Sequence, residues 1–273
     1  MSTLEERFQK GLEMRERLAG GEGRMFRGSA VPVAYELAPD MYRISTESFY
    51  GSIWSRPGLD LKHRAMATLT VAAIQLATPQ VRAHVRNCLN VGIKPEEIVE
   101  IFMMIAFYGG IPAAYNALAV TKEVFGERGL HVVLPETFDA STTPEALYEQ
   151  GMAKHKELTP DVFGYHPTEP TPEEHDLDVL MQQYLWGAIW TRPGLDTKSR
   201  LVCNLAALVV TGSYDLSTRR MIEGALRYGL SKKEIMEIGM QLAFYVGILP
   251  ARAFMHIANT VFRSPEFADT TNA

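Results

Sequence analysis

One histidine of this chain, His84, lies where a helix would carry it along an apolar stripe. In the segment VRAHVRNCLNVG, Val81, His84, Cys88 and Val91 recur at helical spacing. A histidine in such a stripe is either a hydrogen-bonded core residue or the polar group that lines a pocket. Imidazole titrates near neutral pH, so in a pocket it could deliver a proton to a small substrate or remove one.

Arginines stand at the same place in two similar turns of the sequence. Arg56 and Arg192 each come two residues after a tryptophan and precede Pro-Gly. A guanidinium held at such a turn could bind a carboxylate with two hydrogen bonds. Alternatively, each arginine could satisfy carbonyls at a helix end and pack on Trp54 or Trp190. Arg64, one turn into the next helix, is either an anion ligand or a member of an ion pair.

Other groups could take part in chemistry, and each has a plainer alternative. Tyr108 precedes a glycine pair and either presents its phenol to a pocket or packs in the core. Glu97 and Glu100 are three residues apart, which could suit acid–base chemistry or a metal ion. Their place at a helix start makes capping and the helix dipole a sufficient explanation. We expect His63 to be a solvated surface residue, and no acid or histidine cluster has the spacing of metal ligands.

The elements that position these residues occur twice in the chain. FYGSIWSRPGLDLKHR, residues 49–64, returns as YLWGAIWTRPGLDTKSR at 184–200, with an offset of 136 residues. VGIKPEEIVEIFMMIAFYGGIPAA is matched 137 residues later by YGLSKKEIMEIGMQLAFYVGILPA. Similarity of this length indicates a tandem duplication. We therefore divide the chain into a first copy, residues 1–135, and a second copy, residues 136–273.

Both copies read as helix nearly throughout. Apolar residues follow helical rather than strand periodicity, and glycine and proline separate the periodic segments. Neither copy contains a convincing β-hairpin. The sequence therefore predicts an all-α protein, with a bundle of roughly six helices in each copy.

Composition and charge exclude several classes of protein. The formal net charge is −5, and no cluster of lysine and arginine contradicts it, so we expect no binding to nucleic acid. No apolar run reaches the roughly 18 residues that would cross a bilayer, and the charged N-terminus is unlike a signal peptide. The two cysteines lie far apart, which argues against a disulfide framework or a cysteine-rich zinc site. We expect a cytoplasmic protein that does not bind membranes.

The ordered motifs resemble one known family. They are W-x-R-P-G-L-D-x-x-x-R, then H-V-R-x-x-L-x-x-G, then P-E-E-I-x-E-I, then A-x-Y-x-G-x-P-A. Together they resemble the carboxymuconolactone decarboxylase family, over about residues 40–126 in the first copy and 145–262 in the second. The resemblance implies an all-α bundle that forms rings with three-fold symmetry. For a tandem chain it implies a homo-oligomer, with a trimer forming a pseudo-hexameric ring.

The resemblance also implies which copy is competent. The family places its characteristic histidine at the position of His84, eight residues before Gly92. Eight residues before Gly229 the second copy has Met221, which cannot transfer a proton. The resemblance therefore implies that catalysis through this histidine belongs to the first copy. The family favours glutamate four residues before its histidine, and Gln80 at that place is a departure that allows a changed substrate.

The activity that the resemblance implies is decarboxylation of a small carboxylated lactone or related cyclic acid through an enolate. The conjugated carbonyl of such a substrate accepts the electrons, so no cofactor and no metal is expected. His84 would manage the proton. The residues expected to bind the substrate are Trp54, Arg56, Arg64, Tyr108 and Arg192. The alternatives are an enolate-type isomerase, a lactone hydrolase, or a non-catalytic module that binds a ligand or assembles with partners.

Overall fold

The computed structural model describes residues 3–21, 31–137, 139, 141–164, 166–212 and 215–268, and within them every regular element is a helix. The first copy contains α1 (Leu4–Ala19), α2 (Val31–Leu37), α3 (Pro39–Ile44), η1 (Ser45–Trp54), α4 (Leu61–Ile74), α5 (Thr78–Asn90), α6 (Pro95–Ile105) and α7 (Ile111–Glu127). The second contains α8 (Pro144–Leu158), α9 (Pro172–Leu180), η2 (Met181–Ile189), α10 (Thr197–Thr211), α11 (Asp215–Tyr228), α12 (Lys232–Val246) and α13 (Ile248–Phe262). The prediction of an all-α fold is confirmed.

The helices of the two copies correspond in order. Six positions are shared: α1 with α8, the continuous α3–η1 with α9–η2, α4 with α10, α5 with α11, α6 with α12, and α7 with α13. Helix α2 has no counterpart among the described elements of the second copy. The tandem arrangement of roughly six helices per copy is therefore confirmed. None of the described helices is both long and apolar enough to span a membrane.

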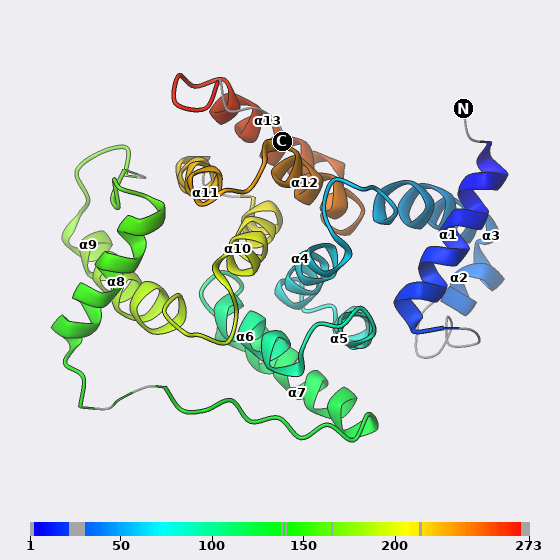
Figure 1. The fold of residues 1–273 in the computed structure, drawn as a ribbon, viewed down its shortest axis with the longest axis horizontal. Coiled ribbons are helices and arrows are strands. Elements are labelled where there is room, and N and C mark those ends of the chain that lie inside the picture. The colour runs from blue at the N-terminus through cyan, green and yellow to red at the C-terminus, as the bar shows by residue number, and fades with distance from the viewer. Residues whose placement is uncertain are drawn as a thin grey trace.

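The two copies share their hydrophobic core. Figure 1 shows α4 and α10 side by side at the centre, with α1 to α3 and α8 to α9 at opposite ends of the molecule. Helices α4, α10 and α12 all contact one another. The core around Trp54 also contains Cys203 from the second copy, and the core around Trp190 contains Val71 from the first. The copies are thus parts of one packed body.

Each copy pairs its first helix with a π-helix through glycine. A Cβ atom on Gly11 of α1 would lie 2.1 Å from the carbonyl oxygen of Thr46 in η1. A Cβ atom on Gly151 of α8 would lie 1.8 Å from the carbonyl oxygen of Gln182 in η2. Only glycine permits this close approach of two backbones. The two glycines are 140 residues apart, so this offset relates α1 to α8.

The π-helix η1 aligns aromatic side chains. The Ser52 hydroxyl donates to the carbonyl oxygen of Glu47, five residues earlier, at 2.9 Å, which matches the wide turn of a π-helix. Tyr50 and Trp54 lie with their ring planes within 10° of parallel and their centroids 6.4 Å apart. π-helical turns are rare and occur frequently at functional sites. The widened helix therefore marks the region of Trp54 as a place to look for one.

A buried ion pair joins the first copy to the second. Glu237 of α12 is contacted by Arg64 Nη2 at 2.7 Å and by Arg56 Nη2 at 2.6 Å. Arg64 is completely buried, and its Nη1 donates to Gln241 Oε1 at 3.1 Å. Burial alone would raise the pKa of Glu237, but the two arginines lower it below its ordinary value. A Cβ atom on Gly58 would lie 2.6 Å from Glu237 Cγ, which explains the glycine of the Arg-Pro-Gly-Leu turn.

The same arrangement occurs in reverse. Glu100 of α6 accepts from Arg192 Nε at 2.8 Å and from Arg200 Nη2 at 3.1 Å. A Cβ atom on Gly194 would lie 2.7 Å from Glu100 Oε1. Met104 stands where the other pair has a glutamine, and a thioether is only a weak acceptor. Nη1 of Arg200 accordingly has no hydrogen-bond partner.

Replacing Glu237 by alanine should lower the free energy of unfolding by about 3–5 kcal/mol, because Arg64 would keep a buried charge without a partner. Urea unfolding followed by circular dichroism measures the change. The matched control is Glu123→Ala, which removes an exposed carboxylate paired with Arg82 and should cost less than about 1 kcal/mol. Equal losses in the two variants would contradict the structural role that we assign to Glu237.

Candidate functional site

His84 of α5 lies between aromatic rings from both copies. Its side chain is only 6% exposed. Its ring is nearly parallel to Trp54 of η1, at 11° and 6.5 Å between centroids, and meets Tyr245 of α12 edge to face at 5.4 Å. Burial lowers the pKa of His84 from its ordinary 6.5 to about 4. The imidazole is therefore neutral at neutral pH.

The amide of Asn87 orients the His84 ring. Asn87 lies one turn after His84 on α5, and one terminal atom of its side-chain amide is 3.5 Å from His84 Nδ1. When the amide nitrogen is turned to donate to the carbonyl oxygens of Leu18, at 3.1 Å, and Ala83, at 3.3 Å, the amide oxygen faces Nδ1. This assignment follows from the hydrogen-bond network. It favours a proton on Nδ1 and leaves Nε2 as the acceptor nitrogen.

Each copy contributes a tyrosine that contacts polar residues of the other copy. The sequence grouped Tyr108 with His84, but the tyrosine that contacts the His84 ring is Tyr245, its counterpart in the second copy. Tyr108 accepts a hydrogen bond from Asn204 Nδ2 of the second copy at 2.7 Å. This arrangement arises because α12 packs on α4 and η1, while α6 packs on α10 and η2. Burial raises the pKa of Tyr108 to about 12 and raises the pKa of Tyr245 well above its ordinary value, so both phenols stay protonated.

The arginines singled out in the sequence have acidic partners. Arg56 and Arg64 share the buried carboxylate of Glu237, and Arg192 is paired with Glu100. For Arg64 this geometry favours the ion pair over a ligand for a substrate. Arg56 and Arg192 also form ion pairs, which neither of the two interpretations left open for them had named. Their binding of a substrate carboxylate stays a prediction, and it would require them to release or share a glutamate.

A buried arginine outside the sequence motifs lies beside the site. Arg15 of α1 is 7% exposed, its Nη2 donates to the Ser45 hydroxyl at 2.9 Å, and its guanidinium lies 4.2 Å from the centre of the Tyr50 ring. No carboxylate of the described chain pairs with it. Its register with Gly11 and Leu18, four residues before and three after, places it on the buried face of α1. That register was the signal available in the sequence.

Three buried hydrogen-bond donors in this cluster lack acceptors. They are the Nε–H of Arg15, the indole N–H of Trp54 and the hydroxyl of Tyr245. Burial raises the pKa of Tyr245, and the nearby Trp54 and Thr68 oppose that rise only in part. Neither neighbour completes the geometry of a hydrogen bond with the phenol. Buried donors are normally satisfied, so the cluster is suited to an oxygen-rich ligand.

The second copy has different residues at four polar positions of this cluster, and two of the four are no longer polar. Met221 stands at the position of His84, and Gly224 at that of Asn87. His155 stands at the position of Arg15, and Asn204 at that of Thr68. His155 stacks on Trp186 at 3.8 Å, its Nδ1 lies 3.1 Å from Gln182 Oε1, and burial lowers its pKa to about 4. An open hollow of about 520 Å³ lies beside Trp190, and no histidine lines it. The tryptophan wall is thus kept in both copies, whereas the imidazole at the position of His84 is not.

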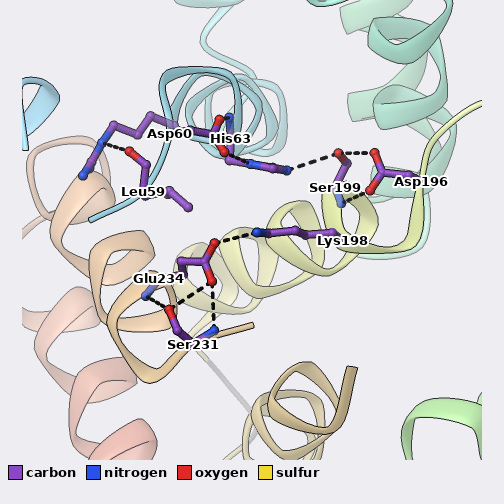
Figure 2. Close-up of polar contacts among 9 residues, drawn as sticks. Leu59, Asp60, His63, Asp196, Lys198, Ser199, Ser231 and Glu234 are labelled. Carbon is purple, nitrogen blue, oxygen red and sulfur yellow. Dashed lines mark hydrogen bonds and ion pairs between the residues drawn. The ribbon is translucent and has the colours of Figure 1, made fainter. Parts of the chain in front are cut away.

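His63 is not the solvated residue that the sequence predicted. Its side chain is 15% exposed, its Nδ1 contacts the Asp60 carboxylate, and its Nε2 lies 3.4 Å from the Ser199 hydroxyl (Figure 2). The order Asp-His-Ser resembles a nucleophilic triad. However, Ser199 is buried and donates its proton to Asp196 at 2.7 Å, so His63 does not activate it. Asp60 and Asp196 cap α4 and α10, and the network joins the two caps.

The paired glutamates of α6 and α12 divide into two roles. Glu97 accepts from the backbone N–H of Lys94 at 2.7 Å, and Glu234 accepts from that of Ser231 at 2.8 Å. Glu234 also binds Lys198 (Figure 2). These are capping roles, as the plainer alternative stated. Glu100 instead forms the buried ion pair between the copies. No three acids, histidines or cysteines of the described chain gather as metal ligands.

Comparison with known proteins now decides the family. The model of the carboxymuconolactone decarboxylase family matches residues 39–123 and again residues 176–260. The chain belongs to this family. The first match runs from α3 into α7 and the second from α9 into α13, so each copy contains one match to the family.

Curated relatives are similar to less than half of the chain. The 4-carboxymuconolactone decarboxylase of Acinetobacter baylyi is 29% identical over 126 residues, which are 46% of this chain and 92% of that protein. A nitrosuccinic acid decarboxylase of Metarhizium robertsii is 30% identical over 120 residues, 44% of this chain and 82% of that protein. An uncharacterized 15.0 kDa protein of Paracoccus denitrificans is 30% identical over 122 residues, 44% of this chain and 91% of that protein. At this identity the comparisons support a decarboxylase-family member and leave the substrate open.

His84 can be replaced by methionine, the residue that the second copy has at this position. The free energy of unfolding of this variant should fall less than that of the wild type as the pH is lowered from 6.5 to 4. The unfolded chain takes up a proton near the ordinary pKa of 6.5, whereas folded His84 does so only near 4. The contribution of the neutral His84 to the free energy of unfolding is therefore complete above pH 6.5 and is lost as the pH falls toward 4. At about 1.4 kcal/mol per pKa unit, the wild type should lose ~3 kcal/mol more than His84→Met over that range. Urea unfolding at a series of pH values tests this, and parallel profiles would contradict the burial of a neutral imidazole.

Proposed function

We propose that this protein is a cofactor-independent decarboxylase of a small acid whose carbon skeleton can accept the electrons that departing CO2 leaves behind. The observation that carries the proposal is the neutral, buried His84 in a cluster with three buried hydrogen-bond donors that lack acceptors. A carboxylated lactone or a related cyclic acid fits this description. The names of two relatives support it, because both describe decarboxylases of small acids.

The proposed reaction needs an electron acceptor within the substrate. The carbon–carbon bond to the carboxylate breaks, CO2 leaves, and the electron pair moves into a conjugated carbonyl to form an enolate. A nitro group can accept an electron pair in the same way. The indole N–H of Trp54 and the hydroxyl of Tyr245, both buried and unpaired, are placed to stabilise the negative oxygen that develops. Donors fixed in a dry site stabilise developing charge without reorganising.

His84 would supply the proton that completes the reaction. Burial lowers the pKa of its ring to about 4, so the resting imidazole is neutral. A bound anion raises the pKa of a neighbouring imidazole, so the imidazolium would form when the substrate is present. It would then transfer its proton to the enolate carbon and become neutral again. Proton transfer by a positioned group of this kind typically contributes a factor of about 10²–10⁴ to the rate.

The first test is release of CO2 from a panel of carboxylated butenolides and small nitro acids. We expect turnover of at least one compound by the wild type. His84→Met should lower kcat by roughly 10²- to 10⁴-fold and leave the far-ultraviolet circular dichroism unchanged. The control His155→Gln alters the buried histidine of the second copy and should keep nearly full activity. Gln80, four residues before His84, is exposed, so Gln80→Glu tests whether this position selects the substrate.

The same reactions distinguish the alternatives. Nuclear magnetic resonance spectra of the panel would reveal an isomerised or ring-opened product without loss of carbon. Such a product, formed by a His84-dependent reaction, would replace the decarboxylase with an isomerase or a lactone hydrolase. Full activity of His84→Met would remove the histidine from the mechanism. Absence of any turnover across the panel would favour the non-catalytic module.

We also propose that the chain assembles with copies of itself. Exposed apolar side chains recur at equivalent positions of the two copies. The recurring residues are Met41, Ile44, Phe107 and Ile111 in the first copy and Leu177, Leu180, Phe244 and Ile248 in the second. Exposed apolar surface of this kind marks interaction sites. Because the surface is present twice in each chain, contacts between unlike copies could close a ring.

Light scattering coupled to size exclusion should give the mass of a trimer. The double variant Ile44→Lys/Leu180→Lys should dissociate at least partly, because two exposed apolar positions would carry charge into the contact. Val133→Lys is the matched control, since Val133 is 93% exposed in the connection between the copies and lies outside the recurring set. A monomeric wild type, or a double variant of unchanged mass, would overturn the proposed assembly.

A further inference from the structure

We propose that Arg15 is the anion-binding residue of the first-copy site and that it holds a negatively charged group that the substrate keeps throughout the reaction. The substrate would then be a dianionic acid, with one carboxylate bound by Arg15 and the other leaving as CO2. The first part stands on geometry alone. The second part rests on the proposed decarboxylase function.

Arg15 is a buried cation without an acidic partner in the described part of the chain. It is 93% buried as a residue, since only 7% of its surface is exposed, yet its charge has no carboxylate partner in the described part of the chain. The buried arginines Arg64 and Arg200 each have a glutamate at 2.7 and 3.1 Å. An uncompensated buried charge is costly. A protein that pairs its other buried arginines leaves this one for an external anion.

Arg15 lies at one end of a series of aromatic rings that leads to His84. The Arg15 guanidinium covers the Tyr50 ring at 4.2 Å, Tyr50 lies parallel to Trp54, and Trp54 lies parallel to His84. The positive charge of Arg15 also opposes the rise in the pKa of Tyr50 and of Tyr245, so it acts across the cluster. Tyr245 lies beside Trp54 and interacts with the charge of Arg15, so the unpaired donors on these three residues are near one another. What this site lacks is an acceptor with negative charge.

Arg15 and His84 occur together in the first copy, and the second copy has neither residue at the equivalent positions. By the 140-residue offset of α1 and α8, Arg15 corresponds to His155, which burial keeps neutral at neutral pH and which has Gln182 as a partner. His84 corresponds to Met221. The paired arginines and the glycine contacts are kept in both copies, so folding does not require Arg15 in particular. Its presence in the copy with His84 therefore indicates a ligand.

The choice between the two carboxylates of the substrate follows from transition-state stabilisation. A carboxylate that leaves as CO2 loses its charge, so a cation bound to it stabilises the reactant more than the transition state and slows the reaction. A cation bound to a carboxylate that remains does not have this effect. It also orients the substrate, so that the departing group lies against the aromatic wall and His84.

Binding of simple acids tests the subsite without turnover. Isothermal titration calorimetry would compare succinate, a dianion, with butyrate, a monoanion of similar length. Wild type should bind succinate more tightly than butyrate. Arg15→Gln should weaken succinate binding roughly tenfold to a hundredfold, as expected for loss of a hydrogen bond to a charged group, and Arg15→Lys should weaken it less. The control Arg17→Gln removes an exposed arginine of the same helix and should change neither affinity.

A thermal melt separates binding from a structural role. Arg15→Gln should melt at the same temperature as the wild type or higher, because it removes an unpaired buried charge. Unchanged succinate binding in Arg15→Gln, a lower melting temperature with unchanged binding, or no succinate binding by the wild type would each overturn the proposal.

The two proposals can fail separately. If succinate binds through Arg15 but no acid releases CO2, the subsite stands and the decarboxylase does not. If CO2 is released and Arg15→Gln keeps the kcat and KM of the wild type, the decarboxylase stands and the subsite is overturned.

Discussion

The structure depends on two buried ion pairs that cross between the copies. In each, a glutamate of one copy lies between two arginines of the other, and one of these arginines is almost fully buried: Arg64 with Glu237, and Arg200 with Glu100. Taking these charges out of water is expensive unless both partners are present. Since the partners belong to different copies, neither copy can compensate its own charges. The pairs therefore hold the copies together and set the turn that follows Trp54, in which glycine makes room for the facing glutamate.

Duplication allowed the scaffold and the chemistry to separate. The ion pairs, the glycine contacts and the tryptophan at the end of the π-helix occur in both copies. The histidine of α5, its neighbouring asparagine and the buried arginine of α1 occur in the first copy only. The second copy still contributes to the first site, because Tyr245 reaches the His84 ring across the interface. One copy can thus lack the histidine of α5 while its tyrosine still contributes to the site of the other copy.

The site combines features that cost stability. It holds a neutral imidazole whose pKa is lowered by burial to about 4, phenols kept protonated by burial, and a buried cation without an acid. Functional sites commonly keep such unfavourable groups because binding or catalysis requires them. The large shared core and the ion pairs between the copies stabilise the fold and so offset this cost. The same low polarity that lowers the pKa of His84 would strengthen every hydrogen bond made to a ligand in the cluster.

The amino-acid sequence alone determined the duplication, the all-α class, the apolar stripe that carries His84 and its replacement by Met221, because these follow from periodicity and from alignment of the chain with itself. It did not reveal that Tyr245 rather than Tyr108 contacts His84, that Arg56, Arg64 and Arg192 are paired with glutamates, or that Arg15 is buried without an acid. The tyrosine contact and the ion pairs depend on which residue of one copy lies opposite which residue of the other, whereas the burial of Arg15 depends on the packing of α1 on η1 within the first copy. The contacts between the copies join positions from 92 residues apart, in Arg192 and Glu100, to 181 residues apart, in Arg56 and Glu237. The packing of α4, α10 and α12 brings such positions together.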